Sequence, residues 1–268
     1  MTDLHGGVCS VTFRKESPGR IISECEALGI GAIEWGADVH VPPGRLDNAA
    51  RIMRMCADSG IRCPSYGSYY RAGKSDPASF AAVIAAASEL GCETIRVWAG
   101  DRGPAPDEDY YRRVADDARR IASAAEEAGL TISFESHQDT LTETPDSRAK
   151  LDSFIVHENV RHYWQPPHGM DDSACLTSLE ALGDRLTNIH VFHWRPDPAL
   201  LPPFERLPLQ DGVARWSRFL TSAMLLPGPA RYCLLEFVLA DSFEQLAEDW
   251  QALREVLNGL RGGLAARG

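Results

Sequence analysis

Two carboxylates stand at the ends of short apolar runs, where a charged group is costly unless something stabilises it. Glu135 follows Thr-Ile-Ser-Phe, and Glu236 follows Cys-Leu-Leu. A carboxylate in such a setting must be paired with a cation, bound to a metal or kept protonated. These two residues are therefore the first candidates for a metal-binding or acid/base site.

Further metal-type side chains follow similar runs. His190 lies in LTNIHVFHW, and the segment HYWQPPHGM carries Gln165 with His168 three positions later. Two carboxylates, an imidazole and an amide oxygen form a mixed oxygen and nitrogen set that suits Mn²⁺ first, with Mg²⁺, Co²⁺ or Fe²⁺ as alternatives. Each residue alone is a weak signal, and the combination predicts a divalent-metal site.

Polar and aromatic side chains near the ends of the other runs are candidates for contacting a substrate. They are Glu34, His40, Tyr66, Arg96, Trp98, His168 and His193. Structural roles compete with the functional roles of the metal-binding candidates as well. Glu236 could pair with a buried arginine, and a backbone carbonyl could accept a hydrogen bond from His190. In a regular strand His193 points to the opposite side from His190, where it could simply pack under the helices.

The elements that must position these residues follow an alternating pattern. Short β-branched runs and longer segments of helical periodicity succeed one another. The predicted strands are 6–13, 31–36, 61–67, 94–100, 130–136, 160–165, 186–194 and 231–238, and the clearest helical segments are 43–60, 76–91, 107–129 and 241–260. Eight alternations predict an α/β fold, one (β/α)8 TIM barrel domain over residues 1–268.

A doubly wound open sheet is the rival fold, but no glycine-rich phosphate loop follows the first run. The proline-rich stretch 194–209 is long for a connection in such a fold. It is either a lid over the active site or a covering loop.

The composition of the chain argues against several classes of function. The 268 residues carry 27 Lys and Arg against 38 Asp and Glu, a net charge of -11, which disfavours binding to nucleic acid. No apolar run is long enough for a membrane span or signal peptide, so we expect a cytoplasmic protein. The seven cysteines are scattered without a CxxC pair, which argues against disulfides and structural zinc.

The order of these residues resembles that of the xylose isomerase-like TIM barrels, specifically the sugar phosphate isomerase/epimerase group. The anchors are IEWG, FESH, IHVFHW and LLEFV, and they span nearly the whole chain. The resemblance implies that Glu135 and Glu236 bind metal and also act as the acid/base pair, and that His190 is the imidazole ligand. Where the family usually has Asp-x-x-His, this chain has Gln165-Pro-Pro-His168, and His193 replaces an acidic residue.

The resemblance implies a metal-dependent isomerase or epimerase of a sugar or related polyhydroxy carbonyl compound. A divalent cation would stabilise an enediolate while Glu135 and Glu236 remove and return the proton. Two alternatives stay open: a dehydratase or lyase using the same site, and a non-catalytic barrel that binds a small ligand after losing its metal. The partner expected is a small sugar-like molecule, with a homo-oligomer also possible.

Overall fold

The computed structural model describes residues 1–104, 107–200 and 204–265. Eight parallel strands form its centre. They are β1 (Leu4–Cys9), β2 (Ile33–Gly36), β3 (Ser65–Arg71), β4 (Thr94–Trp98), β5 (Thr131–Glu135), β6 (Val160–Trp164), β7 (Leu186–Val191) and β10 (Arg231–Leu235). Each pairs with its neighbours in sequence order, and β1 closes the ring on β10. The α/β barrel predicted from the sequence is confirmed.

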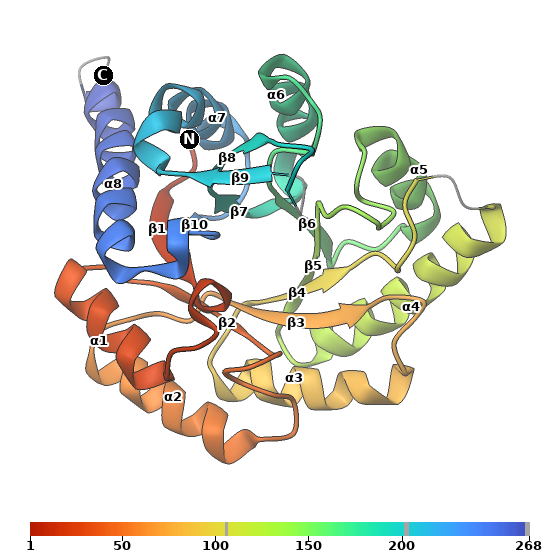
Figure 1. Ribbon diagram of the computed structural model, residues 1–268. Helices are drawn as coiled ribbons and strands as arrows, with labels where there is room; N and C mark the ends of the chain where they lie inside the picture. The colour runs from red at the N-terminus through yellow and green to blue at the C-terminus, as the bar shows by residue number, and fades with distance from the viewer. Residues whose placement is uncertain (105–106, 201–203, 266–268) are drawn as a thin grey trace.

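Helices surround the strands, as Figure 1 shows, and the described part of the chain has eight α-helices. They are α1 (Pro18–Leu28), α2 (Leu46–Asp58), α3 (Phe80–Glu89), α4 (Glu108–Glu127), α5 (Pro145–Ile155), α6 (Asp172–Glu180), α7 (Val213–Leu225) and α8 (Phe243–Ala265). One helix follows each barrel strand, so the strands run parallel and their carboxyl ends share one rim.

Local sequence explains the helix that was clearest in the pattern, α4. Asp107 caps its first turn by accepting a hydrogen bond from the Tyr110 backbone N–H, 2.9 Å away. Val114, Ala118 and Ile121 then lie on one buried face at helical spacing. The periodicity therefore fixes both the helix and the side that packs on the barrel.

Several strand predictions are wrong in their extent, and the third strand, for example, is Ser65–Arg71, not 61–67. The first strand is Leu4–Cys9, not 6–13, and the residues after it, Ser10–Phe13, form a 3-10 turn. The predicted run 186–194 is two strands: β7 ends at Val191, and β8 (His193–Pro196) pairs antiparallel with β9 (Phe204–Leu207). Phe192 separates them, so the chain leaves the barrel there.

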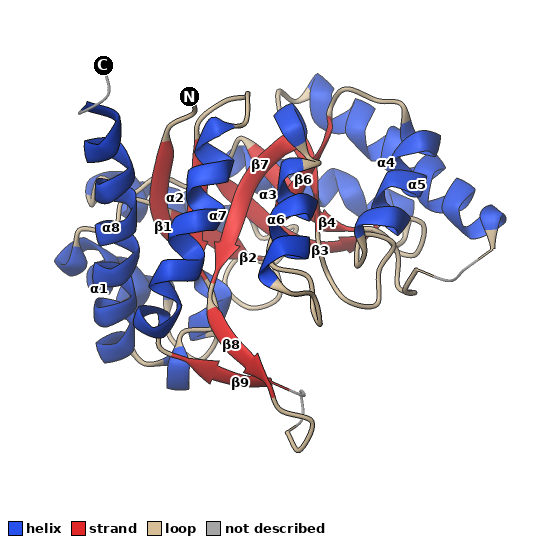
Figure 2. Cartoon of the chain, turned by 90° about the horizontal axis from the view of Figure 1, so that it is seen from above, coloured by secondary structure: helices blue, strands red, loops and turns tan. Residues whose placement is uncertain are grey.

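The β8–β9 hairpin occupies most of the proline-rich stretch 194–209. Figure 2 shows it beyond the arrowhead end of β7, at the rim where the barrel strands end. Residues 201–203 of the stretch lie outside the described residues. The described parts of the stretch thus include two paired strands at the carboxyl end of the barrel.

All seven cysteines are free and buried, as expected for thiols that act as small core residues. Among the described residues, none of the helices combines the length and apolar character needed to cross a membrane.

Candidate active site

Three predicted ligands converge at the carboxyl rim of the barrel. Glu135 ends β5, His190 lies in β7, and Glu236 directly follows β10. The His190 Nδ1 atom is 3.6 Å from a Glu135 oxygen and 3.3 Å from Glu236 Oε2. One ligand atom from each residue lies within 4.8 Å of the other two, and all three side chains are buried.

Gln165, the fourth predicted ligand, comes directly after β6. Its side-chain oxygen lies 3.0 Å from His190 Nδ1, on the same side as the two carboxylates. Gln165 is also buried. The structure thus gathers the other three residues around one nitrogen of His190.

Glu135 is held by two donors on its other oxygen. The Trp98 indole N–H donates to Glu135 Oε2 at 2.6 Å, and the Arg96 guanidinium also donates to it. Arg96 in turn donates through Nε to Glu34 Oε1 at 2.9 Å. Arg96 therefore bridges a carboxylate at the rim and a carboxylate deeper in the barrel.

Glycine makes room for this bridge. Gly67 lies on β3, and a Cβ added there would stand 2.5 Å from Arg96 Nη2 and 3.2 Å from Glu34 Oε1. Any side chain at this position would displace the guanidinium. The glycine is therefore required by the close approach of the ion pair.

Glu34 lies below the rim in a network of buried hydrogen bonds. Its Oε2 atom accepts from Ser65 Oγ and from the Tyr163 hydroxyl, both at 2.7 Å. Asn188 Nδ2 donates to the Tyr163 oxygen at 2.8 Å. The Glu34 side chain is 1% exposed, so it contacts protein groups on every side instead of solvent.

The carboxylates differ in their electrostatic surroundings. Burial opposes ionisation of Glu34, but Arg96 and His190 overcome it and lower the pKa of Glu34 to about 2. The same two neighbours lower the pKa of Glu135 below its usual value despite its burial. For Glu236, burial raises the pKa, which His190 opposes and Glu135 reinforces.

Glu236 also differs in its hydrogen bonds. Its Oε2 atom is buried and accepts no hydrogen bond within the described structure. His190 Nε2 is likewise without a hydrogen-bond partner there. Burial opposes protonation of His190, but the pKa of its imidazole is raised well above the usual value by Glu236, Cys9 and Glu135. Unpaired buried polar atoms are rare, and here one belongs to His190 and the other to the carboxylate beside its Nδ1 atom.

A cavity of about 160 Å³ opens above these residues. Aromatic and imidazole rings form most of its wall. Its lining residues are Arg14, Tyr69, Arg96, Trp98, Glu135, His137, Gln138, Gln165, His168, Trp194, Phe204, Glu236 and Phe237. A second cavity of about 280 Å³ shares Arg14, Glu236 and Phe237 with it. Glu236 therefore lines both cavities.

The β8–β9 hairpin supplies the cover of the smaller cavity. The Trp194 and Phe204 rings have centroids 4.1 Å apart, and His168 lies against Trp194 at 4.7 Å. Phe237, which follows Glu236, packs on Trp194 at 5.4 Å. Of the two interpretations of the proline-rich stretch, this position favours a lid.

Three predicted substrate residues, Arg96, Trp98 and His168, line the cavity, while four others lie elsewhere. Glu34 lies beneath it, as described above. His40 is buried, with its ring nitrogens 3.1 Å from Ser10 Oγ and 3.2 Å from the Glu16 carbonyl oxygen. Tyr66 donates to the Val41 carbonyl oxygen at 2.6 Å, because alternation along β3 turns it outward when Gly67 faces inward.

His193 is the fourth residue outside the cavity lining. It lies in β8 opposite Leu207, and its ring packs against the backbone of Gly212. The break at Phe192 removes it from the β7 strand that carries His190. The packing role considered in the sequence analysis matches this position.

Several cavity residues escaped the sequence analysis as site candidates. They are Arg14, Gln138, Phe204 and Phe237. Tyr69 and Phe237 have positive φ angles of 57° and 54°, which are uncommon for non-glycine residues and concentrate at functional sites. Positive φ leaves no mark in sequence, although Phe237 directly follows a predicted catalytic residue.

Comparison with protein-family models places this chain in a family. The sequence model described as "Xylose isomerase-like TIM barrel" matches residues 22–258. A search of curated proteins finds no match.

Among solved structures, the chain is similar to the probable 3-DHS dehydratase from Bacillus anthracis involved in petrobactin synthesis, with 17% identity, a TM-score of 0.79, and coverage of 95% of this chain and 99% of that one. It is also similar to a xylose isomerase-like TIM barrel protein from Mycobacterium smegmatis in complex with magnesium. The identity is 15% and the TM-score 0.71, with coverage of 97% of this chain and 98% of that one. A third similar structure is that of D-allulose 3-epimerase from Methylomonas sp. Its identity is 14% and its TM-score 0.70, with coverage of 96% of this chain and 99% of that one. At these identities the structures establish the fold alone.

Proposed function

The chain belongs to the xylose isomerase-like TIM barrel family, and we propose that it is a divalent-metal-dependent isomerase or epimerase of a polyhydroxy carbonyl compound. The observation that carries this proposal is the convergence of Glu135, Glu236 and Gln165 on His190 at the floor of a cavity. Solved epimerases share the fold, which agrees with this chemistry.

A count of buried charges supports a cation in this place. Glu34, Glu135 and Glu236 all lie within 4.0 Å of His190, and among the described residues Arg96 is the one guanidinium that pairs with any of them. With His190 neutral, as a metal-binding imidazole must be, three ionised carboxylates against one arginine leave an excess of two negative charges. Uncompensated buried charge is strongly unfavourable, and a divalent ion would balance it.

The same count gives a reason for Gln165. An aspartate at this position would add a third uncompensated negative charge, whereas the amide supplies an oxygen ligand without charge. The donor set of two carboxylates, one imidazole and one amide oxygen fits Mn²⁺ and also Mg²⁺. When bound, the ion would polarise the substrate carbonyl and stabilise the negative charge that develops on it.

The two catalytic carboxylates have different tasks in this proposal. Glu236 has a free, buried oxygen that faces the cavity, so it takes the proton from the carbon next to the carbonyl. Glu135 is held in place by Trp98 and Arg96; it takes up a proton from solvent and delivers that proton to the other face of the resulting enediolate. Burial raises the pKa of Glu236, which makes it the stronger base of the two.

The cavity walls suggest a compact substrate. Trp98, Trp194 and Phe204 present ring faces, which stack on the C–H faces of sugars. His137 and His168 supply polar atoms between the rings, and the rings of His137 and Trp98 lie 4.7 Å apart. The aromatic cover excludes water, which strengthens electrostatic interactions at the floor.

A dehydratase is the second candidate. The similarity to a probable dehydratase over 99% of that chain favours it. The same base would remove a proton next to a carbonyl, and loss of a hydroxyl from the adjacent carbon would follow. The two reactions differ in product mass, because dehydration removes one water molecule and epimerisation removes nothing.

One experiment tests the proposal and separates the candidates. Protein loaded with Mn²⁺ is incubated in D₂O with a panel of ketoses, inososes and cyclic hydroxy ketones, and products are analysed by mass spectrometry and NMR. We expect deuterium at a carbon next to a carbonyl, without mass loss for an epimerase and with loss of water for a dehydratase. Absence of exchange and of metal binding would leave a non-catalytic barrel as the better interpretation.

A further inference from the structure

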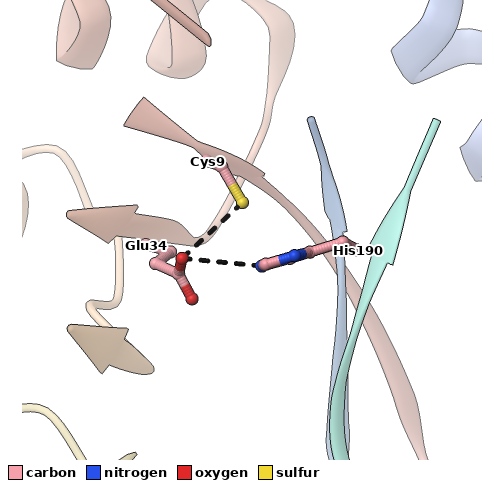
Figure 3. Close-up of side chains that lie close together, drawn as sticks. All are labelled: Cys9, Glu34 and His190. Carbon is pink, nitrogen blue, oxygen red and sulfur yellow. Dashed lines mark hydrogen bonds and ion pairs between the residues drawn. The ribbon is translucent and has the colours of Figure 1, made fainter. Parts of the chain in front are cut away.

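The two ring nitrogens of His190 face different groups. Nδ1 faces the predicted metal ligands Gln165, Glu135 and Glu236. Nε2 points the other way, and the nearest carboxylate oxygen is Glu34 Oε1 at 3.5 Å. Figure 3 shows Glu34 opposite the ring of His190, with Cys9 beside the pair.

We propose that Glu34 is a positioning residue, whose carboxylate accepts the Nε2–H of His190 and thereby leaves Nδ1 as the atom that binds the cation. This inference rests on the proposed metal site and deepens it. A neutral imidazole carries one N–H, so an acceptor at one nitrogen decides that the other nitrogen is the ligand. Carboxylates that orient metal-binding histidines in this way recur in metalloenzymes.

The surroundings of Nε2 offer Glu34 as the acceptor. Within the described structure this buried nitrogen has no hydrogen-bond partner. The Cys9 thiol is the other group nearby, with Sγ 3.9 Å from Glu34 Oε1. Burial raises the pKa of Cys9 to about 12, so the thiol keeps its proton and acts as a donor toward Glu34.

The same three residues do not suit a second cation. Cys9, Glu34 and His190 bring one ligand atom each within 4.8 Å of one another. However, Arg96 Nε already donates to Glu34 Oε1 at 2.9 Å, which places a guanidinium beside the carboxylate oxygen that a cation would need. This cluster therefore serves as the support beneath the metal site.

Glu34 is rigidly held for this purpose. Ser65 and Tyr163 donate to one of its oxygens, and Arg96 donates to the other. The distance of 3.5 Å to Nε2 exceeds the hydrogen-bonding range of about 2.7–3.2 Å by a few tenths of an ångström. The proposed hydrogen bond therefore requires the imidazole to approach Glu34 by only a few tenths of an ångström.

A wild-type measurement tests the tautomer directly. Protein with ¹⁵N-labelled histidine is loaded with ¹¹³Cd²⁺, and NMR identifies the nitrogen coupled to the metal and the nitrogen that carries a proton. We expect metal coupling at His190 Nδ1 and a proton on Nε2. Coupling at Nε2, or an Nε2 without a proton, overturns the inference while leaving the metal site intact.

Titration of Glu34 variants with Mn²⁺ then measures how much Glu34 contributes to the affinity for the metal. Loss of an outer partner of a ligand typically weakens metal binding by about 10–100-fold, so we expect about 10-fold for Glu34→Gln and about 100-fold for Glu34→Leu. Glu34→Gln keeps the test open if the leucine variant does not fold. Tyr163→Phe is the matched control, because it removes one buried hydroxyl from the network and leaves the Glu34 carboxylate in place.

The outcomes separate this inference from the proposed function. If the Tyr163→Phe protein binds Mn²⁺ within about 3-fold of wild type while Glu34→Gln does not, the positioning role is supported. If Glu34→Gln binds as tightly as wild type, the positioning role is refuted and the metal site stands. If wild-type protein binds neither Mn²⁺ nor Cd²⁺, the proposed function fails and this inference fails with it.

Discussion

Two buried histidines in this barrel pair with carboxylates, yet their surroundings differ in charge. His190 on β7 faces Glu34, Glu135 and Glu236 from inside the barrel. His162 on β6 points outward, and its Nε2 atom lies 3.1 Å from Asp152 Oδ1 on α5. Both histidines are fully buried, so burial does not distinguish them.

The difference lies in the number of carboxylates and the cations that balance them. Asp152 is the carboxylate that pairs with His162, and Arg185 neutralises it at 2.9 Å. Burial lowers the pKa of His162, opposed by Asp152, whereas the pKa of His190 is raised. A balanced pair of this kind is a structural device, and an unbalanced cluster beside a cavity is a functional candidate.

The largest effect should come from removing the proposed base. Glu236→Gln keeps the shape of the side chain but cannot take a proton, so we expect deuterium exchange into a substrate to fall by about 10³-fold. Asp152→Asn, the corresponding change in the other cluster, should leave the exchange rate unchanged. Exchange by Glu236→Gln within 10-fold of wild type would contradict the assigned role.

Metal-dependent stability should separate the two histidines. Mn²⁺ at about 100 times its dissociation constant should stabilise the wild-type fold by about 2.7 kcal/mol. Removing Mn²⁺ with a chelator should reverse the gain. The stabilisation by Mn²⁺ should vanish in His190→Gln and persist in His162→Gln. Thermal unfolding of each variant with and without Mn²⁺ measures it. Equal responses of both variants would argue that His190 does not bind the ion.

The structural pair should affect stability alone. Asp152→Asn leaves Arg185 and His162 without their charged partner, and we expect it to cost about 2 kcal/mol. Urea unfolding measures this cost. Titration with Mn²⁺ provides the control, because affinity should stay at the wild-type value, and a marked loss of affinity would show that the two clusters are coupled.

The smallest effect is a pH dependence from His162. Its pKa is lowered in the folded protein, so below the unfolded value of about 6.5 the unfolded chain takes up a proton that the folded chain resists. The stability contributed by neutral His162 is therefore lost as the pH falls, by at most about 1.4 kcal/mol per pH unit.

Comparison of wild type with His162→Gln separates the pH dependence of stability due to His162 from that due to other titrating groups. The difference in unfolding free energy between wild type and the variant should shrink as the pH is lowered from about 7.5 to about 5. A difference that is constant over this range, or that grows, would mean that the pKa of His162 is not depressed in the folded state.

Much of the site followed from the sequence because of one property of parallel barrels. The carboxyl ends of the strands share one rim, so Glu135, Gln165, His190 and Glu236 meet there even though they are distant along the chain. Each comes at the end of an apolar run, and that local pattern is visible in the residues themselves. The fold class followed in the same way from alternating periodicities.

Tertiary structure alone decided the layer beneath the rim and the cover above it. Tyr163 reaches Glu34 across the barrel interior, 129 positions along the chain, because closure brings β6 and β2 to face each other. The run 186–194 has continuous strand character, and its break at Phe192 depends on β9 offering a partner to β8. Local sequence determines which residues favour strands and helices, whereas long-range contacts decide where each strand ends and what each buried charge meets.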